Sequence, residues 1–300
     1  MTTVSLDSLN VTYPDGTHAV RDVSMSVAEG ELVAVVGESG CGKSTLAKTL
    51  LGVLPAGSTV TGSVRLGGRD LSGASPGDWR DVRGREVGYV SQDPFAAMDP
   101  LWRIGSNVGE AWRIKHASPA PGQVAASLEA VGIEEAAERM RQFPHEWSGG
   151  MLQRAEIAAA GAWAPQLLVA DEPTAALDAD LADAIMERLR TSAASVLLIS
   201  HDLALVSRHA DRVLVMYGGR VVEAGRDVLR VPRHPYTVGL LAAIPRPGHG
   251  LPTPLDGFPP DLRDDAPGCP FAPRCTRALP PCHTTTPALA EGLACPVVLA

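Results

Sequence analysis

The stretch GESGCGKS at residues 37–44 matches the pattern G-x-x-x-x-G-K-[ST]. In this pattern, glycines let successive backbone N–H groups curl around phosphate oxygens, the lysine reaches the β- and γ-phosphates, and the hydroxyl ligates Mg²⁺. A glycine-rich turn before an ordinary helix is the alternative, which the apolar strand before the loop and the helix-like segment after it disfavour. The residues predicted to contact the nucleotide are Gly37, Glu38, Ser39, Gly40, Cys41, Gly42, Lys43, Ser44 and Thr45.

A second candidate group is the pair of carboxylates in VADEP at residues 169–173, where an apolar run ends. Two acids at a buried strand end are costly unless a cation or a water uses them. Asp171 suits the Mg²⁺ shell, and Glu172 suits polarising an attacking water. A solvated loop with two acids is the alternative. Together with the phosphate loop, the pair predicts nucleotide hydrolysis.

With EWSGGMLQR at residues 146–154, these motifs resemble those of the ATP-binding subunits of ABC transporters. The resemblance implies ATP and Mg²⁺ as ligands and an ATPase that works as a head-to-tail dimer. Ser148, Gly149 and Gly150 are similar to the family's signature motif, which caps the γ-phosphate held by the opposite subunit. A Ser-Gly-Gly turn at a helix start offers a hydroxyl and bare N–H groups to an anion. Taken alone, such a turn is more often an ordinary helix cap.

The same resemblance assigns roles to further residues. Gln92 in VSQDP resembles the glutamine that senses Mg²⁺ and the attacking water, and His201 in LLISHD resembles the switch histidine that contacts the γ-phosphate. Asp178 in AALD resembles the loop that crosses the dimer interface, and Tyr13 in VTYPDG resembles the aromatic that stacks on adenine. The implied catalytic set is Glu172, His201 and Gln92, and the implied Mg²⁺ set is Ser44, Gln92 and Asp171.

Two positions depart from the family pattern. Trp147 stands where the signature motif usually has leucine, and Ala175 stands where the interface loop often has serine or threonine. Neither change removes a catalytic group. The resemblance therefore implies that the chain contributes to both half-sites of a dimer.

The elements that must position these residues follow from the apolar pattern. ELVAVVG, QLLVADE and SVLLISHD are short apolar runs of the kind found in a parallel sheet covered on both faces. Near the amino terminus, apolar residues alternate with polar ones as in a half-buried strand, at Val4, Leu6, Leu9 and Val11. We therefore expect an α/β fold, a P-loop ABC ATPase core with an N-terminal antiparallel β subdomain.

Composition divides the chain further. Residues from about 95 to 160 contain helix-like runs and no such strand, so we expect a helical subdomain there. VLVMYGGRVVEAG predicts a hairpin that turns at Gly218 and Gly219. Fifteen of the 25 prolines fall between 231 and 300, which disfavours long helices and central strands in that part. The sequence predicts a nucleotide-binding domain over 1–230 and a loop-rich, Cys- and Pro-rich extension over 231–300.

Charge and hydropathy exclude several functions. The net charge of −8 and the pI near 5.5 argue against nucleic acid as a partner, because phosphate binding needs clustered positive charge. The amino-terminal MTTVSLDSLNVTY has no basic start followed by an apolar core, so it does not resemble a secretory signal. The apolar runs are shorter than the roughly 20 residues needed to cross a bilayer. We expect a cytosolic chain whose membrane role is peripheral.

Three strings point to one branch of the family. GMLQR, SQDPFAAMDPLWRIG and HPYTVGLLAAIP resemble the branch that serves oligopeptide, dipeptide and nickel uptake. That resemblance implies a second ABC ATPase subunit, two transmembrane permease subunits and an extracytoplasmic substrate-binding protein as partners, at the cytoplasmic face of a bacterial membrane. Peptide import is the expected function. Nickel or metal-chelate uptake is the alternative, and a soluble non-transport ABC ATPase or a non-hydrolysing regulatory subunit is less favoured.

Four of the five cysteines lie in the extension with the spacing C-x5-C-x6-C-x12-C, at Cys269, Cys275, Cys282 and Cys295. A cytosolic location disfavours structural disulfides. Four thiolates can hold an iron–sulfur cluster or zinc, although the tight pairs usual for structural zinc are absent. The branch resemblance implies a [4Fe-4S] cluster, with Zn²⁺ as the fallback and unligated thiols as the remaining alternative. The fifth, Cys41, lies at a predicted helix start, where a thiol pKa tends to fall.

Overall fold

The computed structural model describes residues 2–175, 177, 179–244 and 251–299. The chain divides into two compact units. The first unit comprises Met1–Val4, Ser26–Leu32 and Arg65–Leu198, and the second comprises Ser5–Met25, Val33–Val64 and Ile199–Ala300. The domain boundary expected at residue 230 stays a prediction. The position of Asp178 lies outside the described residues.

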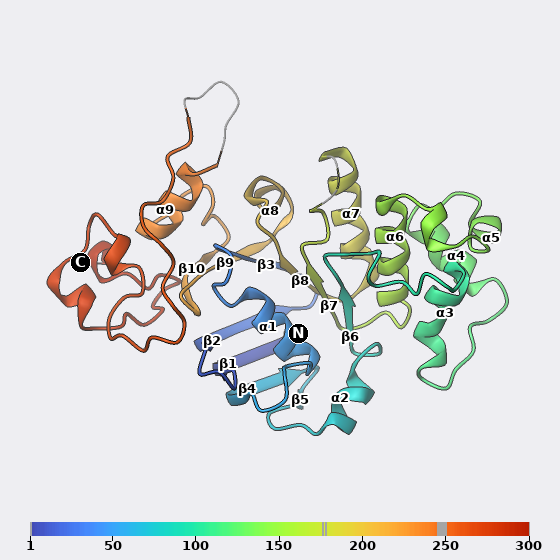
Figure 1. The fold of residues 1–300 in the computed structure, drawn as a ribbon, viewed down its shortest axis with the longest axis horizontal. Helices are drawn as coiled ribbons and strands as arrows, with labels where there is room; N and C mark the ends of the chain where they lie inside the picture. Colours follow the sequence, from blue (N-terminus) through green and yellow to red (C-terminus); the bar gives the residue numbers. More distant parts are fainter. Residues whose placement is uncertain (1, 176, 178, 245–250, 300) are drawn as a thin grey trace. The chain divides into compact units, whose positions relative to one another are not determined.

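Three strands come first in the chain, and strands alternate with helices over residues 167–217 (Figure 1). The strands are β1 (Thr2–Thr12), β2 (His18–Ala28), β3 (Leu32–Val36), β4 (Thr59–Leu66), β5 (Arg69–Asp70), β6 (Val87–Val90), β7 (Leu167–Asp171), β8 (Val196–Ile199), β9 (Arg212–Tyr217) and β10 (Arg220–Gly225). The α-helices are α1 (Lys43–Leu51), α2 (Pro76–Val82), α3 (Ile104–Arg113), α4 (Gln123–Ala130), α5 (Ala136–Arg139), α6 (Gly149–Ala160), α7 (Ala179–Ser192), α8 (Leu203–His209), α9 (Pro235–Ala242) and α10 (Pro296–Leu299). Short 3-10 turns are η1 (Pro144–Glu146), η2 (Ala272–Arg274) and η3 (Pro280–His283).

The strands form two sheets. One has four strands in the order β2-β1-β4-β5, and the other has six in the order β10-β9-β3-β8-β7-β6. In the larger sheet β3 runs parallel to β9 and β6 runs parallel to β7, whereas β10 is antiparallel to β9. In the smaller sheet β4 and β5 pair antiparallel. The expected α/β class with an added β subdomain is confirmed.

Burial explains why the apolar runs form the central strands. All five residues of β3 and all four of β8 are buried, as a parallel sheet covered on both faces requires. In β1 the alternating apolar side chains are at most 3% exposed, namely those of Val4, Leu6, Leu9 and Val11. Both patterns expected from the sequence are therefore confirmed.

Helices alone occupy the part of the first unit between β6 and β7. There α3, α4, α5 and α6 pack against one another and form the green group in Figure 1. This packing agrees with the helical segment expected near residues 95–160. Across the described ranges, no helix has both the length and the apolar character that membrane crossing requires.

The carboxyl-terminal extension belongs to the second unit, where it packs beside the β9–β10 hairpin. The hairpin turns at Gly218 and Gly219, whose φ angles of 57° and 79° fit the two-residue turn expected there. Backbone hydrogen bonds from Ala294 N to Val222 O (2.9 Å) and from Ala224 N to Gly292 O (2.8 Å) join the extension to β10. The other described residues of the extension form loops and short helices, as its prolines predict.

Candidate active site

The phosphate loop of the second unit connects β3 to α1, and its glycines are required by close backbone contacts. Gly37 and Gly42 have φ angles of 151° and 109°. A Cβ atom would lie 2.2 Å from Met216 O at Gly37 and 2.2 Å from Ala19 O at Gly42. No other residue type fits these two positions without displacing the neighbouring strand or turn.

Lys43 begins α1 and its side chain folds back over the loop. The Lys43 ammonium donates hydrogen bonds to Gly37 O (2.8 Å) and Glu38 O (2.9 Å), and the residue is 9% exposed. The residue before it, Gly42, has no side chain that could cap the first turn of the helix. The backbone N–H groups at this end therefore suit an anion, which the partial positive charge of the helix end also attracts.

Two other predicted nucleotide contacts belong to the same unit. The Tyr13 hydroxyl shares a 2.8 Å hydrogen bond with Thr45 Oγ1, which links the β1–β2 turn to the start of α1. Just beyond β8, Ser200 N donates to Val35 O of β3 at 3.3 Å. His201 is the next residue, so it lies at the edge of the sheet where β3 passes into the phosphate loop. The second unit thus brings Tyr13 to the loop and His201 to the same sheet edge.

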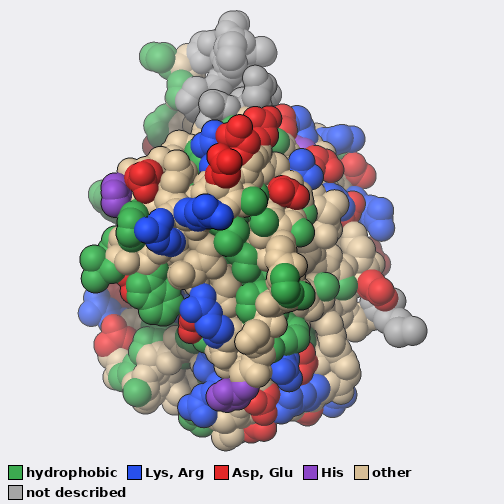
Figure 2. All heavy atoms as spheres, turned by 90° about the vertical axis from the view of Figure 1, so that its right-hand side faces the viewer, with side chains coloured by type: hydrophobic (Ala, Val, Ile, Leu, Met, Phe, Trp, Pro, Cys, Tyr) green, Lys and Arg blue, Asp and Glu red, His purple; other side chains and the backbone are tan. Residues whose placement is uncertain are grey.

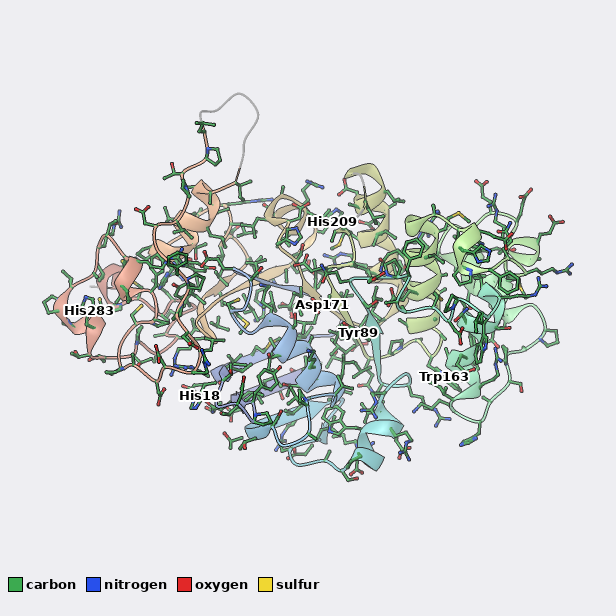
Figure 3. The ribbon with its side chains drawn as sticks, in the orientation of Figure 1. His18, Tyr89, Trp163, Asp171, His209 and His283 are labelled. Carbon is green, nitrogen blue, oxygen red and sulfur yellow. The ribbon has the colours of Figure 1, made fainter. Side chains whose placement is uncertain are left out.

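The first unit holds the predicted carboxylates at the end of β7. Asp171 and Glu172 are half-buried, and Glu172 has a φ of 51° in the left-handed region that non-glycine residues rarely adopt. Strained backbone of this kind persists where the surrounding structure fixes it, and it concentrates at functional sites. Figure 3 labels Asp171 and, on neighbouring β6, Tyr89. Burial, followed by the charges of Asp171 and Glu156, raises the pKa of Tyr89.

Gln92 lies at the same edge of the sheet as Asp171. The parallel register pairs Val90 with Ala170, so the chain leaves β6 beside the residue that precedes Asp171. Gln92 is exposed two positions beyond the end of β6. The carboxyl ends of parallel strands meet at one edge, and this arrangement brings these two predicted residues together within the first unit.

The signature residues form the start of α6. Ser148 is the N-cap, and its hydroxyl accepts a hydrogen bond from Met151 N at 3.3 Å. Ser148 is exposed, whereas a Cβ atom at Gly150 would lie 2.6 Å from Leu181 Cδ2. The departure at Trp147 is structural, because its side chain is 4% exposed and its indole N–H donates to Gln142 Oε1 at 2.8 Å.

Sequence reasoning missed Glu156, which lies on α6 beyond the signature residues. Its carboxylate accepts a 2.7 Å hydrogen bond from Ser91 N, one residue before Gln92. Gln153 donates to the other carboxylate oxygen at 3.3 Å. Burial raises the pKa of Glu156 to about 7, although the hydrogen bond from Ser91 lowers it. The one signal in the sequence was the acidic Glu156 beside the apolar run that ends this helix.

The structure corrects the expectation for Cys41. Its thiol is 5% exposed, and burial raises its pKa, although the neighbouring Lys43 ammonium acts in the opposite direction. Desolvation of the thiolate outweighs the helix start on which the expected lowering rested.

The four cysteines of the extension are free thiols, like Cys41. Cys282 and Cys295 are buried. Burial, followed by the proximity of Cys295 and Cys282, raises the pKa of Cys269 to about 11, and the same influences raise that of Cys275. The part of the chain that the structure describes contains no group of three His, Cys, Asp or Glu side chains placed to hold one metal ion. The described residues therefore give no evidence for either the expected [4Fe-4S] cluster or the zinc fallback.

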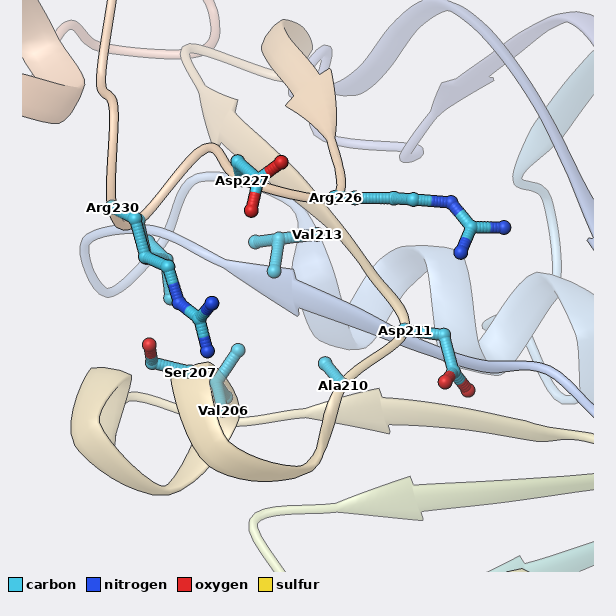
Figure 4. A pocket seen from close by; sticks show the side chains of 9 residues that line it. Val206, Ser207, Ala210, Asp211, Val213, Arg226, Asp227 and Arg230 are labelled. Carbon is cyan, nitrogen blue, oxygen red and sulfur yellow. The ribbon is translucent and has the colours of Figure 1, made fainter.

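The surface of the second unit has hollows outside the phosphate loop. One of about 400 Å³ is lined by Cys269, His283 and Arg21, with prolines of the extension. Another of about 180 Å³, shown in Figure 4, lies beside α8 and mixes the charges of Asp211 and Arg230. The residues that line the second hollow include no predicted site residue.

Comparison with known families agrees with this geometry. A model described as "ABC transporter" matches residues 20–175, slightly more than half of the chain. The chain belongs to the ABC transporter family. Like the other ATPases of this family, this ABC ATPase binds ATP with Mg²⁺ and hydrolyses it. A second model, for the C-terminal region of oligopeptide/dipeptide transporters, matches residues 222–282.

Curated relatives extend the similarity along the ABC ATPase. It is 42% identical to the dipeptide transport ATP-binding protein DppD of Bacillus subtilis, over 95% of this chain and 90% of the relative. It is 40% identical to the oligopeptide transport ATP-binding protein OppD of Escherichia coli, over 95% and 88%. OppD of Mycobacterium tuberculosis is 45% identical over 92% of this chain, which spans 47% of that longer protein.

Solved structures confirm the fold. The ATP-binding cassette MJ0796, described as a dimer in a post-hydrolysis state bound to ADP and phosphate, superposes with a TM-score of 0.65 at 26% identity. The match covers 74% of the ABC ATPase and 98% of that cassette. The expected ABC ATPase core is therefore confirmed.

Proposed function

We propose that this ABC ATPase energises the import of oligopeptides or dipeptides into a bacterial cell. The observation that carries the proposal is the match of residues 222–282 to the C-terminal region of oligopeptide/dipeptide transporters. Relatives with peptide-transport names match over more than nine tenths of the chain, which favours peptides over the nickel alternative.

The proposed ATP chemistry divides among named side chains. Lys43 leaves its two carbonyl partners for the β- and γ-phosphates, and Ser44 with Asp171 holds Mg²⁺. Glu172 polarises the attacking water, while His201 and Gln92 contact the γ-phosphate and the metal shell. Support comes from the glycine geometry of the loop, from the anion-suited start of α1 and from the left-handed backbone at Glu172.

The proposed assembly is a dimer in which Ser148, Gly149 and Gly150 of each subunit cap the nucleotide held by the other. The exposed N-cap at Ser148 supports this role, because a helix start attracts anions. Asp178 is proposed to cross the same interface. The second ATPase subunit can be identical to this chain or a relative of it.

The proposed membrane partners are two permease subunits, to which a substrate-binding protein delivers the peptide. We place the ATPase at the cytoplasmic face of the membrane, bound peripherally. In the segment between β6 and α3, three large apolar side chains are exposed, namely Phe95 (54%), Leu101 (83%) and Trp102 (42%). Figure 2 shows the face that carries the helical part of the first unit, where basic and acidic side chains are interspersed. Such a surface suits a protein partner better than nucleic acid.

For the extension we propose a [4Fe-4S] cluster held by Cys269, Cys275, Cys282 and Cys295. The proposal rests on the spacing of the four cysteines in a proline-rich segment, where the backbone N–H of Cys269 also donates to Cys282 O at 2.7 Å. A cluster of four irons is larger than a single ion, so its ligands lie farther apart than those of zinc. We expect about four irons and four sulfides per chain from an anaerobic preparation. An iron-free chain that is fully folded would refute the cluster.

The transport proposal is tested with the complex in proteoliposomes. The ATPase is reconstituted with its permease subunits, and hydrolysis is measured with the substrate-binding protein free, loaded with peptide or loaded with nickel. We expect stimulation by the peptide-loaded protein alone. Stimulation by the nickel-loaded protein alone would overturn the peptide assignment while leaving the ATPase intact.

A further inference from the structure

An ion pair joins the carboxyl-terminal extension to the phosphate loop within the second unit. Both terminal nitrogens of Arg274 donate to the carboxylate of Glu38, at 2.7 Å and 3.2 Å. Such a bidentate pair fixes both the distance and the orientation of the two groups. The side chain of Arg274 is 5% exposed and that of Glu38 is 24% exposed, so solvent screens the pair less than it screens a surface pair.

The Arg274 guanidinium is itself held in place by further contacts. It donates to Asp256 O (2.6 Å) and to the Tyr217 hydroxyl (3.1 Å). Its central carbon also lies 5.7 Å from the ring centre of Tyr217 and 5.9 Å from that of Phe271. The extension thus presents a cation to the loop in a fixed position.

Glu38 is held from a second side by α9, the first helix of the extension. The backbone N–H of Glu38 donates to the hydroxyl of Tyr236 on α9 at 2.8 Å, and Tyr236 is fully buried. Its carbonyl oxygen accepts from the Lys43 ammonium at 2.9 Å. The position of Glu38 therefore also determines where the ammonium of the phosphate-binding lysine rests.

The sign of the charges gives this contact a functional meaning. Glu38 places a carboxylate in a loop shaped to receive the anionic phosphates of a nucleotide. Like charges repel, and the repulsion is strong where the site is shielded from water. The bidentate pair with Arg274 cancels the carboxylate charge and turns the carboxylate toward the extension.

We propose that Arg274 is a positioning residue for MgATP, which neutralises Glu38 and holds the first turn of the phosphate loop in its binding shape. The inference rests on the nucleotide role proposed above for this loop. It makes the extension a part of the ATP site, although the extension contributes no group to the chemistry.

The test compares Arg274→Gln with wild type in the full chain, by equilibrium binding of MgATP and by ATP hydrolysis. We expect KM for MgATP to rise roughly tenfold with kcat changed less than twofold, because an uncompensated charge weakens binding of the phosphates. Arg274→Lys retains the charge and is expected to recover most of the affinity. The matched control is Arg263→Gln, which removes an exposed ion pair with Asp261 (2.7 Å) in the same extension.

Two further readouts separate neutralisation from simple support of the fold. Replacing Glu38 by Gln in the Arg274→Gln chain removes the uncompensated charge, so KM should return to within about threefold of wild type. The defect of the single variant should also shrink at high salt. A double variant as weak as the single one, or a single variant equal to wild type, would overturn the proposal. Lys43→Ala is run in parallel, because unchanged MgATP binding there would contradict the nucleotide role of the loop instead.

Discussion

The carboxylate of Glu156, on the helix that the signature residues begin, accepts a 2.7 Å hydrogen bond from the backbone N–H of Ser91, next to Gln92. The contact joins two segments of the first unit that the sequence separates by 65 positions. Gln153 supports it from one turn earlier on the same helix. Two predicted functional segments, the signature turn and the Gln92 loop, are thereby connected through a single buried side chain.

This contact predicts a pH-dependent stability. Burial raises the pKa of Glu156 to about 7 in the folded protein, above its ordinary value of 4.5. Its contribution to the free energy of unfolding is fully present below pH 4.5 and is lost as the pH rises toward 7. The difference is on the order of 2–3 kcal/mol. Glu156→Gln does not titrate, so its stability relative to wild type should improve between pH 5 and pH 8.

Chemical unfolding of both chains at several pH values measures this difference. The control is Glu129→Gln, which changes an exposed glutamate on α4 and should leave the pH dependence of wild type in place. Parallel stability curves for wild type and Glu156→Gln would show that Glu156 does not change its protonation in this range.

The glycines of the phosphate loop predict two different costs of substitution. Gly40 and Gly42 both have positive φ angles, of 78° and 109°, but only Gly42 has a backbone atom where a Cβ would stand. Gly40→Ala should cost about 1 kcal/mol from the backbone conformation alone. Gly42→Ala should cost roughly 3 kcal/mol or more, because Ala19 O would have to move. Thermal unfolding of the two variants measures the difference in stability. Equal losses of stability would mean that the close approach of Ala19 O to Gly42 does not contribute to the cost of substitution.

We expect Cys41 to be alkylated slowly, and we expect its alkylation to abolish nucleotide binding. Burial raises its pKa and limits access, so at neutral pH it should react more slowly than a free thiol in solution. Once attached, a bulky group beside Lys43 would fill the space that the phosphates need. Mass spectrometry measures the labelling, with Cys41→Ser as the control and MgATP as the protecting ligand. Full MgATP binding by a chain labelled at Cys41 would contradict this reading.

The sequence was informative wherever a function depends on neighbours along the chain. Each predicted motif lies next to a strand or helix that the sequence pattern shows clearly. The phosphate loop and the VADEP carboxylates follow short apolar runs, and the signature turn precedes a helix, so these strand ends and this helix start could be placed from the sequence. Trp147 departs from the family motif, and the sequence alone could not tell whether its side chain serves the signature turn or the core. Its burial in the structure assigns it to the core.

Contacts between distant segments could not be predicted. Arg274 and Glu38 are 236 positions apart, and their pairing depends on how a proline-rich segment with only short helical turns packs against β9 and α9. The partner of Glu156 depends on how α6 lies against the end of β6. The pKa of Cys41 was misjudged for the same reason, since burial by surrounding segments outweighs the local effect of a helix start.

Accumulation of a labelled peptide in proteoliposomes that contain the complete transporter, with ATP on the side of the ATPase, tests directly whether hydrolysis at this site drives import. The wild-type complex should accumulate peptide only when ATP is present. With Glu172→Gln, MgATP binding should persist, while hydrolysis and accumulation fall roughly a hundredfold or more, as expected when the group that polarises water is removed. Peptide accumulation by the Glu172→Gln complex at the wild-type rate would contradict the central claim that hydrolysis at this site drives import.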